Sequence, residues 1–155
     1  MPRFPRSLQS SPREIGSPAI FGSWSLSPSR KQVAFLIHEN GTDALRIAPF
    51  GGNEPRLLYR TLPGRFLAKS GAFAWTRDEE AVIATMGTYA NPSGELWWFP
   101  VRAGTPRRIL STGGLKDLRM HPDGVRFSFT ADGFRQSIWA VRNALPIRAQ
   151  PSQAK

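Results

Sequence analysis

The chain has 155 residues, enough for one domain with a hydrophobic core, and it contains no cysteine. Disulfide bonds, thiol catalysis and thiolate metal sites are therefore excluded. Lysine and arginine outnumber aspartate and glutamate by 21 to 11, for a formal net charge of +10. This charge suits nucleic-acid binding, but the basic residues are scattered singly or lie near the chain ends, so a solvated basic surface is favoured. Those near the ends are Arg3, Arg6, Arg13, Arg142, Arg148 and Lys155.

Both ends of the chain are expected to be flexible. Residues 1–19 form a leader rich in Pro, Ser and Arg without strand or helix periodicity, and residues 147–155 form a similar tail. The basic start leads into polar residues, and no apolar run could span a bilayer, so neither a signal peptide nor a transmembrane segment is predicted. We expect a cytoplasmic location, or a periplasmic one if the native N-terminus is missing.

Between these ends, a unit of short strands and turns occurs three times. Each copy has a turn, an apolar strand, a polar loop, and a strand that carries leucine, isoleucine or tryptophan. The turns begin at Ser27, Thr76 and His121. A period of about 40 to 50 residues with several short strands per unit predicts the blades of a β-propeller.

We expect antiparallel strands in each blade, running from the innermost to the outermost. Blade one, about residues 20–60, is expected to use 21–26, 32–37, 44–49 and 56–59. Blade two, about residues 70–111, is expected to use 72–75, 81–86, 95–101 and 107–110. Blade three, about residues 115–143, is expected to use 117–120, 126–130 and 137–141 and to lack a fourth strand.

The turns that open the copies differ in quality. In the third, Pro122 presets its own φ, Asp123 can bond the following backbone, and Gly124 accepts a positive φ. The second copy, Thr76 to Glu79, has neither Pro nor Gly, which predicts a less regular blade two. Longer loops are expected after each second strand, over residues 38–43, 87–94 and 131–136.

Catalytic and metal-binding patterns are not found. His38 falls in a predicted loop, and His121 takes a turn position where a local backbone hydrogen bond is its natural role. The acidic cluster from Asp78 to Glu80 is explained by a turn, no Gly-x-Ser-x-Gly elbow occurs, and no metal-ligand spacing occurs. The pairs Gly51-Gly52 and Gly113-Gly114 lack a following helix and indicate turns, not phosphate sites. We therefore predict no catalytic residue, no cofactor and no metal.

The five tryptophans recur at strand positions, which favours packing between blades over a sugar or base platform. Adjacent residues of a strand face opposite sides, so one of Trp97 and Trp98 is expected to be partly exposed and is the aromatic to test for binding. The five are Trp24, Trp75, Trp97, Trp98 and Trp139.

The third copy resembles the TolB-like or WD-type β-propeller repeat of bacterial proteins. The matching residues are Leu118-Arg119-Met120-His121-Pro122-Asp123-Gly124, then Phe127, Phe129, Thr130 and Ile138-Trp139. Asn143-Ala144-Leu145-Pro146 is similar to the end of propellers that terminate a longer chain, behind a kinase, a DNA-binding regulator or a peptidase domain. The resemblance covers about residues 20–146 and implies an all-β partial propeller, the C-terminal portion of such a domain.

Propellers of this family have about six blades, whereas this chain encodes at most three. A partial propeller leaves an unpartnered flank and unpaired strand edges. Three interpretations follow: a fragment of a longer chain, two or more copies that assemble a closed ring, or an open stack capped by the leader. We favour the fragment first and the assembly second.

The leading functional hypothesis is a non-enzymatic module for protein interaction, whose partner is another protein, itself or further blades. The alternatives are a ligand-binding or substrate-gating propeller of an enzyme with its catalytic domain elsewhere, and binding of an anionic polymer. No membrane contact is expected, and nucleic acid is disfavoured. Loops at one rim are expected to carry specificity. The candidate residues are His38, Glu39, Asn40, Arg65, Lys69, Tyr89, Asn91, Lys116, Asp132 and Arg135.

Overall fold

The computed structural model describes residues 20–52, 54–67, 73–92, 94–111, 113–124, 126–131 and 137–141, with the backbone alone for 20–23 and 137–140. The expected leader, the tail and the Asn143-Ala144-Leu145-Pro146 motif lie outside these residues. The described residues contain strands and turns and no helix, which confirms the expected all-β class. They also contain no helix that could cross a membrane.

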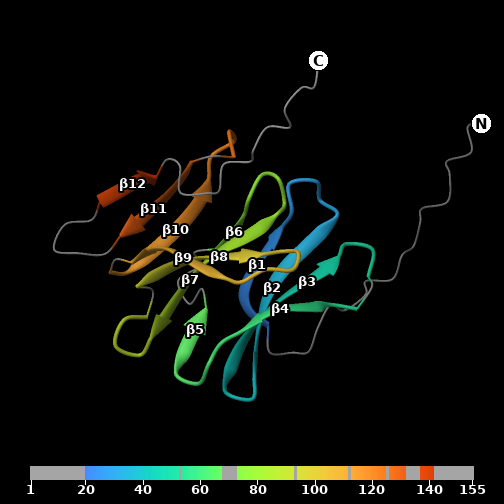
Figure 1. The fold of residues 1–155 in the computed structure, drawn as a ribbon, viewed down its shortest axis with the longest axis horizontal. Helices are drawn as coiled ribbons and strands as arrows, with labels where there is room; N and C mark the ends of the chain where they lie inside the picture. The colour runs from blue at the N-terminus through green and yellow to red at the C-terminus, as the bar shows by residue number, and fades with distance from the viewer. Residues whose placement is uncertain are drawn as a thin grey trace, which may run out of the picture.

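Three antiparallel sheets follow one another along the chain and stand side by side (Figure 1). Blade one holds β1 (Ile20–Leu26), β2 (Gln32–Glu39), β3 (Thr42–Pro49) and β4 (Arg56–Arg60). Blade two holds β5 (Arg65–Leu67), β6 (Phe73–Trp75), β7 (Ala81–Thr88), β8 (Glu95–Pro100) and β9 (Arg107–Ser111). Blade three holds β10 (Leu115–Met120), β11 (Phe127–Ala131) and β12 (Ser137–Val141).

The hydrophobic core has a layer at each junction between blades, and a third buried cluster, Val33, Phe35, Ile37 and Ala48, lies on the face of blade one away from blade two. The first joins β2 and β3 to blade two and includes Leu36, Leu45, Trp75 and Phe99. The second joins β7 and β8 to blade three and includes Ile83, Leu96, Leu118, Phe127 and Phe129. Side chains alternate between the two faces of each strand, so the apolar residues on both sides of β7 fill both layers.

Blade two departs from the expected four strands at its inner edge. The segment β5, which was not expected as a strand, pairs with the end of β7, and β6 pairs with its middle. The inner strands of the other blades are continuous but irregular, because register shifts interrupt β1 between Ile20 and Trp24 and β10 between Lys116 and Arg119. The irregularity predicted for blade two therefore lies in its inner strand.

The turns that open the three copies share one geometry, so the irregularity of blade two does not come from its weaker turn chemistry, as was expected. In each, the N–H of the first residue donates to the carbonyl five residues on, and the N–H of the fourth residue donates back to the first carbonyl. The fourth residue has a positive φ in every copy: Arg30 (60°), Glu79 (59°) and Gly124 (73°). Arg30 and Glu79 thus adopt, with some backbone strain, the left-handed conformation that glycine adopts freely in the third copy.

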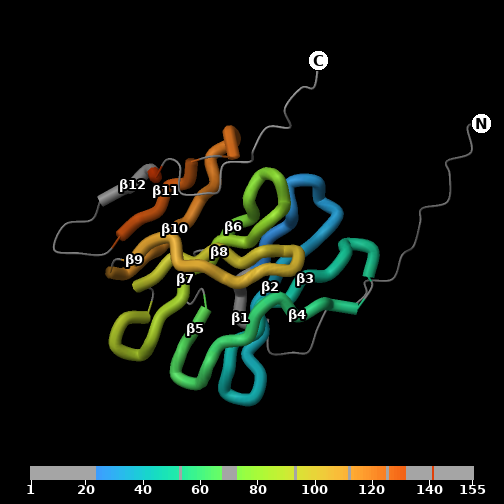
Figure 2. The backbone as a smooth tube through the Cα atoms, viewed as in Figure 1, coloured from blue at the N-terminus to red at the C-terminus, as the bar shows by residue number. Residues whose placement is uncertain are grey.

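These three turns also contact one another at one end of the molecule, which we name the turn rim (Figure 2). The Ser29 N–H and hydroxyl both donate to the Glu79 carboxylate. The Arg77 Nη1 donates to the carbonyl of Pro122 at 2.6 Å. Each turn is therefore fixed by its neighbour as well as by its own hairpin.

Replacing Gly124 with alanine is expected to destabilise the protein more than the same change at Gly41. Both residues have positive φ, but a Cβ on Gly124 would lie 2.5 Å from the Arg77 Cβ, whereas a Cβ on Gly41 meets nothing within 4 Å. We expect Gly41→Ala to cost about 1 kcal/mol and Gly124→Ala about 2 to 3 kcal/mol in denaturant unfolding. Gly124→Ala should cost about 1 kcal/mol less in an Arg77→Gly background, because glycine removes the Arg77 Cβ that the new methyl group would meet. Equal costs at the two glycines would contradict the contact between turns.

Candidate interaction rim

The opposite end of the blades, which we name the loop rim, collects connections that are far apart in sequence. It carries the β2–β3 hairpin, the β4–β5 connection and the β7–β8 loop, along the lower edge of Figure 1. These are the kinds of connections expected to form a rim, namely those between second and third strands and those between blades.

The β2–β3 connection is a tight turn, not the six-residue loop that was expected. Only Asn40 (φ 52°) and Gly41 (φ 72°) lie between the strands, and Glu39 pairs with Thr42. Two successive residues with positive φ are typical of a type I′ hairpin, which favours the sequence Asn-Gly. His38 is therefore part of β2, and its position is fixed by the sheet.

Asp43, at the start of β3, joins the first two blades at this rim. Its Oδ1 lies 2.7 Å from the His38 Nδ1, and its Oδ2 accepts a hydrogen bond from the Leu67 N–H at 2.7 Å. Its own N–H donates to the Thr61 Oγ1 at 2.9 Å. Both carboxylate oxygens are thus used to hold strand β5 and His38, which gives this His–Asp pair a structural role.

Glu39 holds two arginines from neighbouring strands of blade one. The Arg46 Nη2 donates to its Oε1 at 2.9 Å, and the Arg60 Nη2 donates to the same oxygen. These hydrogen bonds, first from Arg46 and then from Arg60, hold the pKa of Glu39 below its usual value. The carboxylate therefore stays ionised and keeps both guanidinium groups in place.

Glu95, at the start of β8, repeats this arrangement in blade two. Its Oε2 accepts hydrogen bonds from the Trp97 Nε1 (2.9 Å) and from Arg65, while its Oε1 accepts one from the Arg108 Nη1 at 3.0 Å. Burial by itself would raise the pKa of Glu95, but the indole and the two guanidinium groups outweigh burial and lower that pKa. The Arg65 guanidinium also lies 5.8 Å from the centre of the Trp97 ring.

The β7–β8 loop presents a large aromatic side chain in a fixed position. Tyr89 is 78% exposed, yet its ring meets the buried Phe66 ring edge to face at a centroid distance of 4.4 Å. The loop is closed by hydrogen bonds between Thr88 and Asn91 in both directions. A Cβ on Gly94 would overlap the Asn91 side chain, so the loop depends on glycine there.

The structure brings six of the ten predicted residues to this rim and places a seventh at the equivalent end of blade three. The six on the elements above are His38, Glu39, Asn40, Arg65, Tyr89 and Asn91, and the exposed Lys116 is the second residue of β10. The other three, Lys69, Asp132 and Arg135, lie outside the described residues.

Residues that the sequence analysis did not select also contribute to the loop rim. Leu62 is 68% exposed in the β4–β5 connection. Its sequence signal was an apolar residue just before Pro63 and Gly64, in a turn. Arg60 and Arg108 gave no such signal, because their partner glutamates lie on other strands of the sheet.

The tryptophan predictions are confirmed in part. Trp75 is buried between blades one and two, and Trp97 and Trp98 pack on opposite sides of β8, one against each core layer. The prediction for Trp24 was wrong, because its side chain is 63% exposed on a face that no other described sheet covers. The side chain of Trp139 lies outside the described residues.

His121 makes the local contact that was predicted, since its Nδ1 accepts a hydrogen bond from the Asp123 N–H at 3.2 Å. The pair Gly51-Gly52 lies in a turn in which the Gly52 N–H donates to the Pro49 carbonyl. Within the described part of the chain, no group of three His, Cys, Asp or Glu side chains could hold a metal ion.

The fold matches solved β-propeller proteins, although no protein-family model and no curated protein matches the chain. TolB from Acinetobacter baumannii matches 77% of this chain with a TM-score of 0.63 and 20% identity, over 29% of its own length. A putative TolB from Agrobacterium tumefaciens matches 77% with a TM-score of 0.62 and 22% identity, over 42% of its length. The tricorn protease matches 73% with a TM-score of 0.55 and 16% identity, over 11% of its length.

These matches show that the fold is a TolB-like partial propeller. The chain spans less than half of the length of each TolB structure. At these identities the likeness concerns the fold alone.

Replacing Glu95 with glutamine is expected to lower stability at neutral pH by about 1 kcal/mol, because two arginines lose an ionised partner. A carboxyl whose pKa is lowered by folding stabilises the protein above the unfolded pKa, near 4.5, and this stabilisation disappears as the pH falls through the lower folded pKa. The difference in unfolding free energy between wild type and Glu95→Gln should therefore be largest near pH 7 and shrink below pH 4.5. Glu54→Gln, at an exposed glutamate of the β3–β4 connection, is the control. A difference that is constant with pH would contradict the lowered pKa.

Proposed function

We propose that this chain is a non-catalytic propeller segment that binds a protein partner through the loop rim. The observation that carries the proposal is Tyr89, a tyrosine 78% exposed on a loop but fixed against Phe66. Tyrosine and arginine are enriched where protein interfaces gain most of their energy. A side chain that is already held in place loses little entropy on binding.

The surroundings of Tyr89 support a protein partner. Arg65 and Arg108 are held by Glu95, and Leu62 adds a second exposed apolar side chain on the same rim. An apolar contact bordered by fixed polar groups is the usual composition of a protein interface. The partner surface that fits offers an apolar patch with hydrogen-bond acceptors beside it.

The same ion pairs speak against the anionic-polymer alternative at this rim. Arg46 and Arg60 share Glu39, and Arg65 and Arg108 share Glu95, so carboxylates partly neutralise these guanidinium groups. A polyanion site would instead gather cations without such partners. Affinity for heparin or DNA that falls steeply with salt would mark any such binding as nonspecific.

The enzyme-associated alternative rests on the match to the tricorn protease, a propeller-containing structure whose name states an activity. Under this alternative the loop rim would face a catalytic domain supplied by another chain or another part of a longer protein. The two functions differ in the identity of what the rim contacts, a regulatory partner or a hydrolase.

Peptides selected against the immobilised chain from a random phage-displayed library test the proposal. The double variant Tyr89→Ala, Leu62→Ser should weaken binding of the selected peptides by about tenfold or more, because it removes both apolar anchors. Phe50→Ser is the matched control, since Phe50 is 62% exposed but lies beside the first turn of the turn rim, where its N–H bonds the Lys31 carbonyl.

Fluorescence titration of each purified variant with the selected peptides gives the affinities, and thermal melting checks the fold. Peptides that bind the double variant as tightly as wild type would refute the loop rim as the site. A large fall in melting temperature would show that Tyr89 supports the fold and would equally count against the proposal.

A further inference from the structure

The two exposed apolar side chains of the loop rim, Leu62 and Tyr89, are both tied to one residue of β5. The Arg65 N–H donates to the Leu62 carbonyl at 3.1 Å, which closes the turn that presents Leu62. Arg65 also pairs with Thr88 of β7, and Tyr89 is the next residue along the chain. The backbone segments that carry the two side chains are therefore fixed on either side of Arg65, and one short peptide can contact both.

Beside this apolar pair, blade two carries more cations than anions. Arg65 and Arg108 share the single carboxylate of Glu95, so the three side chains together keep one net positive charge. Arg108 is the accessible member, because its side chain is 56% exposed against 30% for Arg65. It donates to Glu95 through Nη1. The exposed remainder of this planar guanidinium group suits a carboxylate of a ligand.

Blade one repeats the excess of cations on the other side of the apolar pair. Arg46 and Arg60 share the carboxylate of Glu39, which again leaves one net positive charge. Arg60 is the last residue of β4 and stands two positions before Leu62, and its side chain is 38% exposed. A second guanidinium group is thus within reach of a ligand that contacts Leu62.

Negative charge is scarce around the same side chains. The Asp43 side chain is 13% exposed, and its two oxygens are engaged by His38 and by the Leu67 N–H. Residues 61–64, which follow β4, contain no acidic residue, and neither do residues 89–94 of the β7–β8 loop. A ligand at the apolar pair therefore meets a positive local field.

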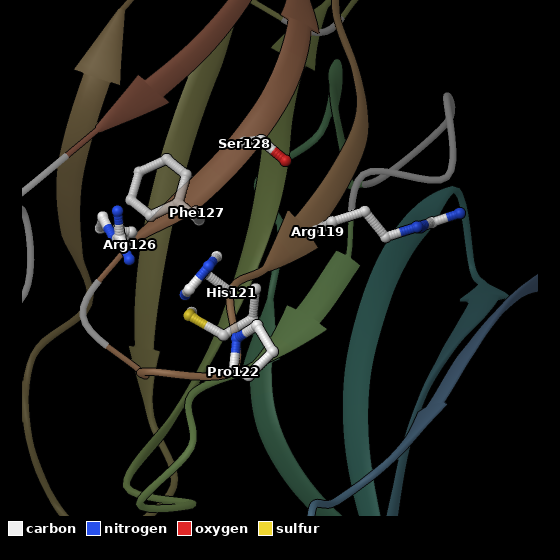
Figure 3. A pocket seen from close by; sticks show the side chains of 7 residues that line it. Arg119, His121, Pro122, Arg126, Phe127 and Ser128 are labelled. Atoms are coloured by element: carbon white, nitrogen blue, oxygen red, sulfur yellow. The ribbon is translucent and has the colours of Figure 1, made fainter.

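A pocket of about 260 Å³ in blade three also combines apolar and basic side chains (Figure 3). Phe127, Arg119 and Arg126 are among the residues that line it. Arg126 is paired with a carboxylate of its own, Asp123, and the Arg119 side chain points away from Arg126 (Figure 3). The two guanidinium groups do not converge there, so this pocket is a suitable comparison for the loop rim.

We propose that the ligand of the loop rim is an acidic peptide segment in which carboxylates flank an apolar side chain. This inference rests on the proposed function and specifies the chemistry of the partner. The apolar side chain contacts Leu62 and Tyr89, and the carboxylates pair with Arg108 and Arg60. Complementary charge of this kind provides specificity and speeds association. The small net charge of the rim suits a few carboxylates and not a polyanion, which requires many cations along its length.

Synthetic versions of the peptides selected by phage display, with both ends blocked, test this chemistry on the wild-type protein. In a second set, every Asp and Glu of the peptide is replaced by Asn or Gln. We expect this replacement to weaken binding by about fivefold to tenfold in fluorescence titrations. Raising NaCl from about 0.05 M to about 0.5 M should weaken the acidic peptides by a similar factor and the neutral ones little. The protein is unchanged in these titrations, so its folding cannot explain the result.

A substitution in the protein assigns the effect to the rim. Arg108→Gln should weaken the acidic peptides by about fivefold, and neutralising the peptide should then cost little more, because both changes remove the same ion pair. Arg119→Gln is the matched control, since Arg119 is an exposed strand arginine beside the blade-three pocket, and it should leave the affinity unchanged. Thermal melting of both variants checks the fold.

The outcomes separate this inference from the proposed function. Selected peptides that depend on Leu62 and Tyr89 but bind equally well after neutralisation, or contain no carboxylate, would keep the loop rim and overturn the acidic partner. Equal losses in Arg108→Gln and Arg119→Gln would also overturn it, because the effect would then follow the net charge and not the rim. Peptides that ignore the double variant Tyr89→Ala, Leu62→Ser would refute the rim itself.

Discussion

The burial of β7 on both of its faces is the constraint on which the arrangement depends. Seven consecutive residues, 81–87, are buried, so the blade-two sheet requires an apolar neighbour on each side. Blades one and three supply these neighbours, and even the Thr85 hydroxyl is enclosed without a hydrogen-bond partner among the described residues. A single blade has no means of covering two apolar faces, so the sheets gain stability only as a stack.

Stacking also explains why the loop rim contains residues from distant parts of the sequence. When sheets pack face to face with their inner strands adjacent, the connections at each end of the strands are brought close together. The Asp43 carboxylate then fixes β5 against blade one, and Glu95 fixes Arg65 across blade two. Ion pairs and hydrogen bonds between strands therefore hold the rim. The exposed Tyr89 packs against Phe66 of β5, one of the segments held in this way.

Most strands could be predicted because their signals are local. Alternating apolar residues and turn chemistry identify β2, β3, β7 and β8 within two residues at each end. Asn40-Gly41 was an equally local signal for a two-residue turn and was overlooked in favour of a longer loop. The strand β5 has too few residues to show a periodicity, and its partner, the end of β7, is about 20 residues further along the chain.

The candidate site was predictable in position but not in its pairing. Residues such as Arg65 and Glu95 stand 30 positions apart, and only the sheet register brings them together. Nothing in the sequence indicated the exposure of Trp24, which is 63% exposed although its strand partner Phe35 on the same face is 2% exposed. Local patterns determine which face a side chain takes, and the presence of a neighbour determines whether that face is covered.

The arginines of the outer strands β4 and β9 explain part of the basic composition without any ligand. β4 begins and ends with arginine, β9 begins with two, and both strands show the same exposure along their length. An outer strand offers unpaired backbone groups to any other extended chain, and bulky cations along it discourage such pairing. Part of the net charge of +10 is thus explained as protection against edge-to-edge aggregation, to which the short sheets of the described residues are open.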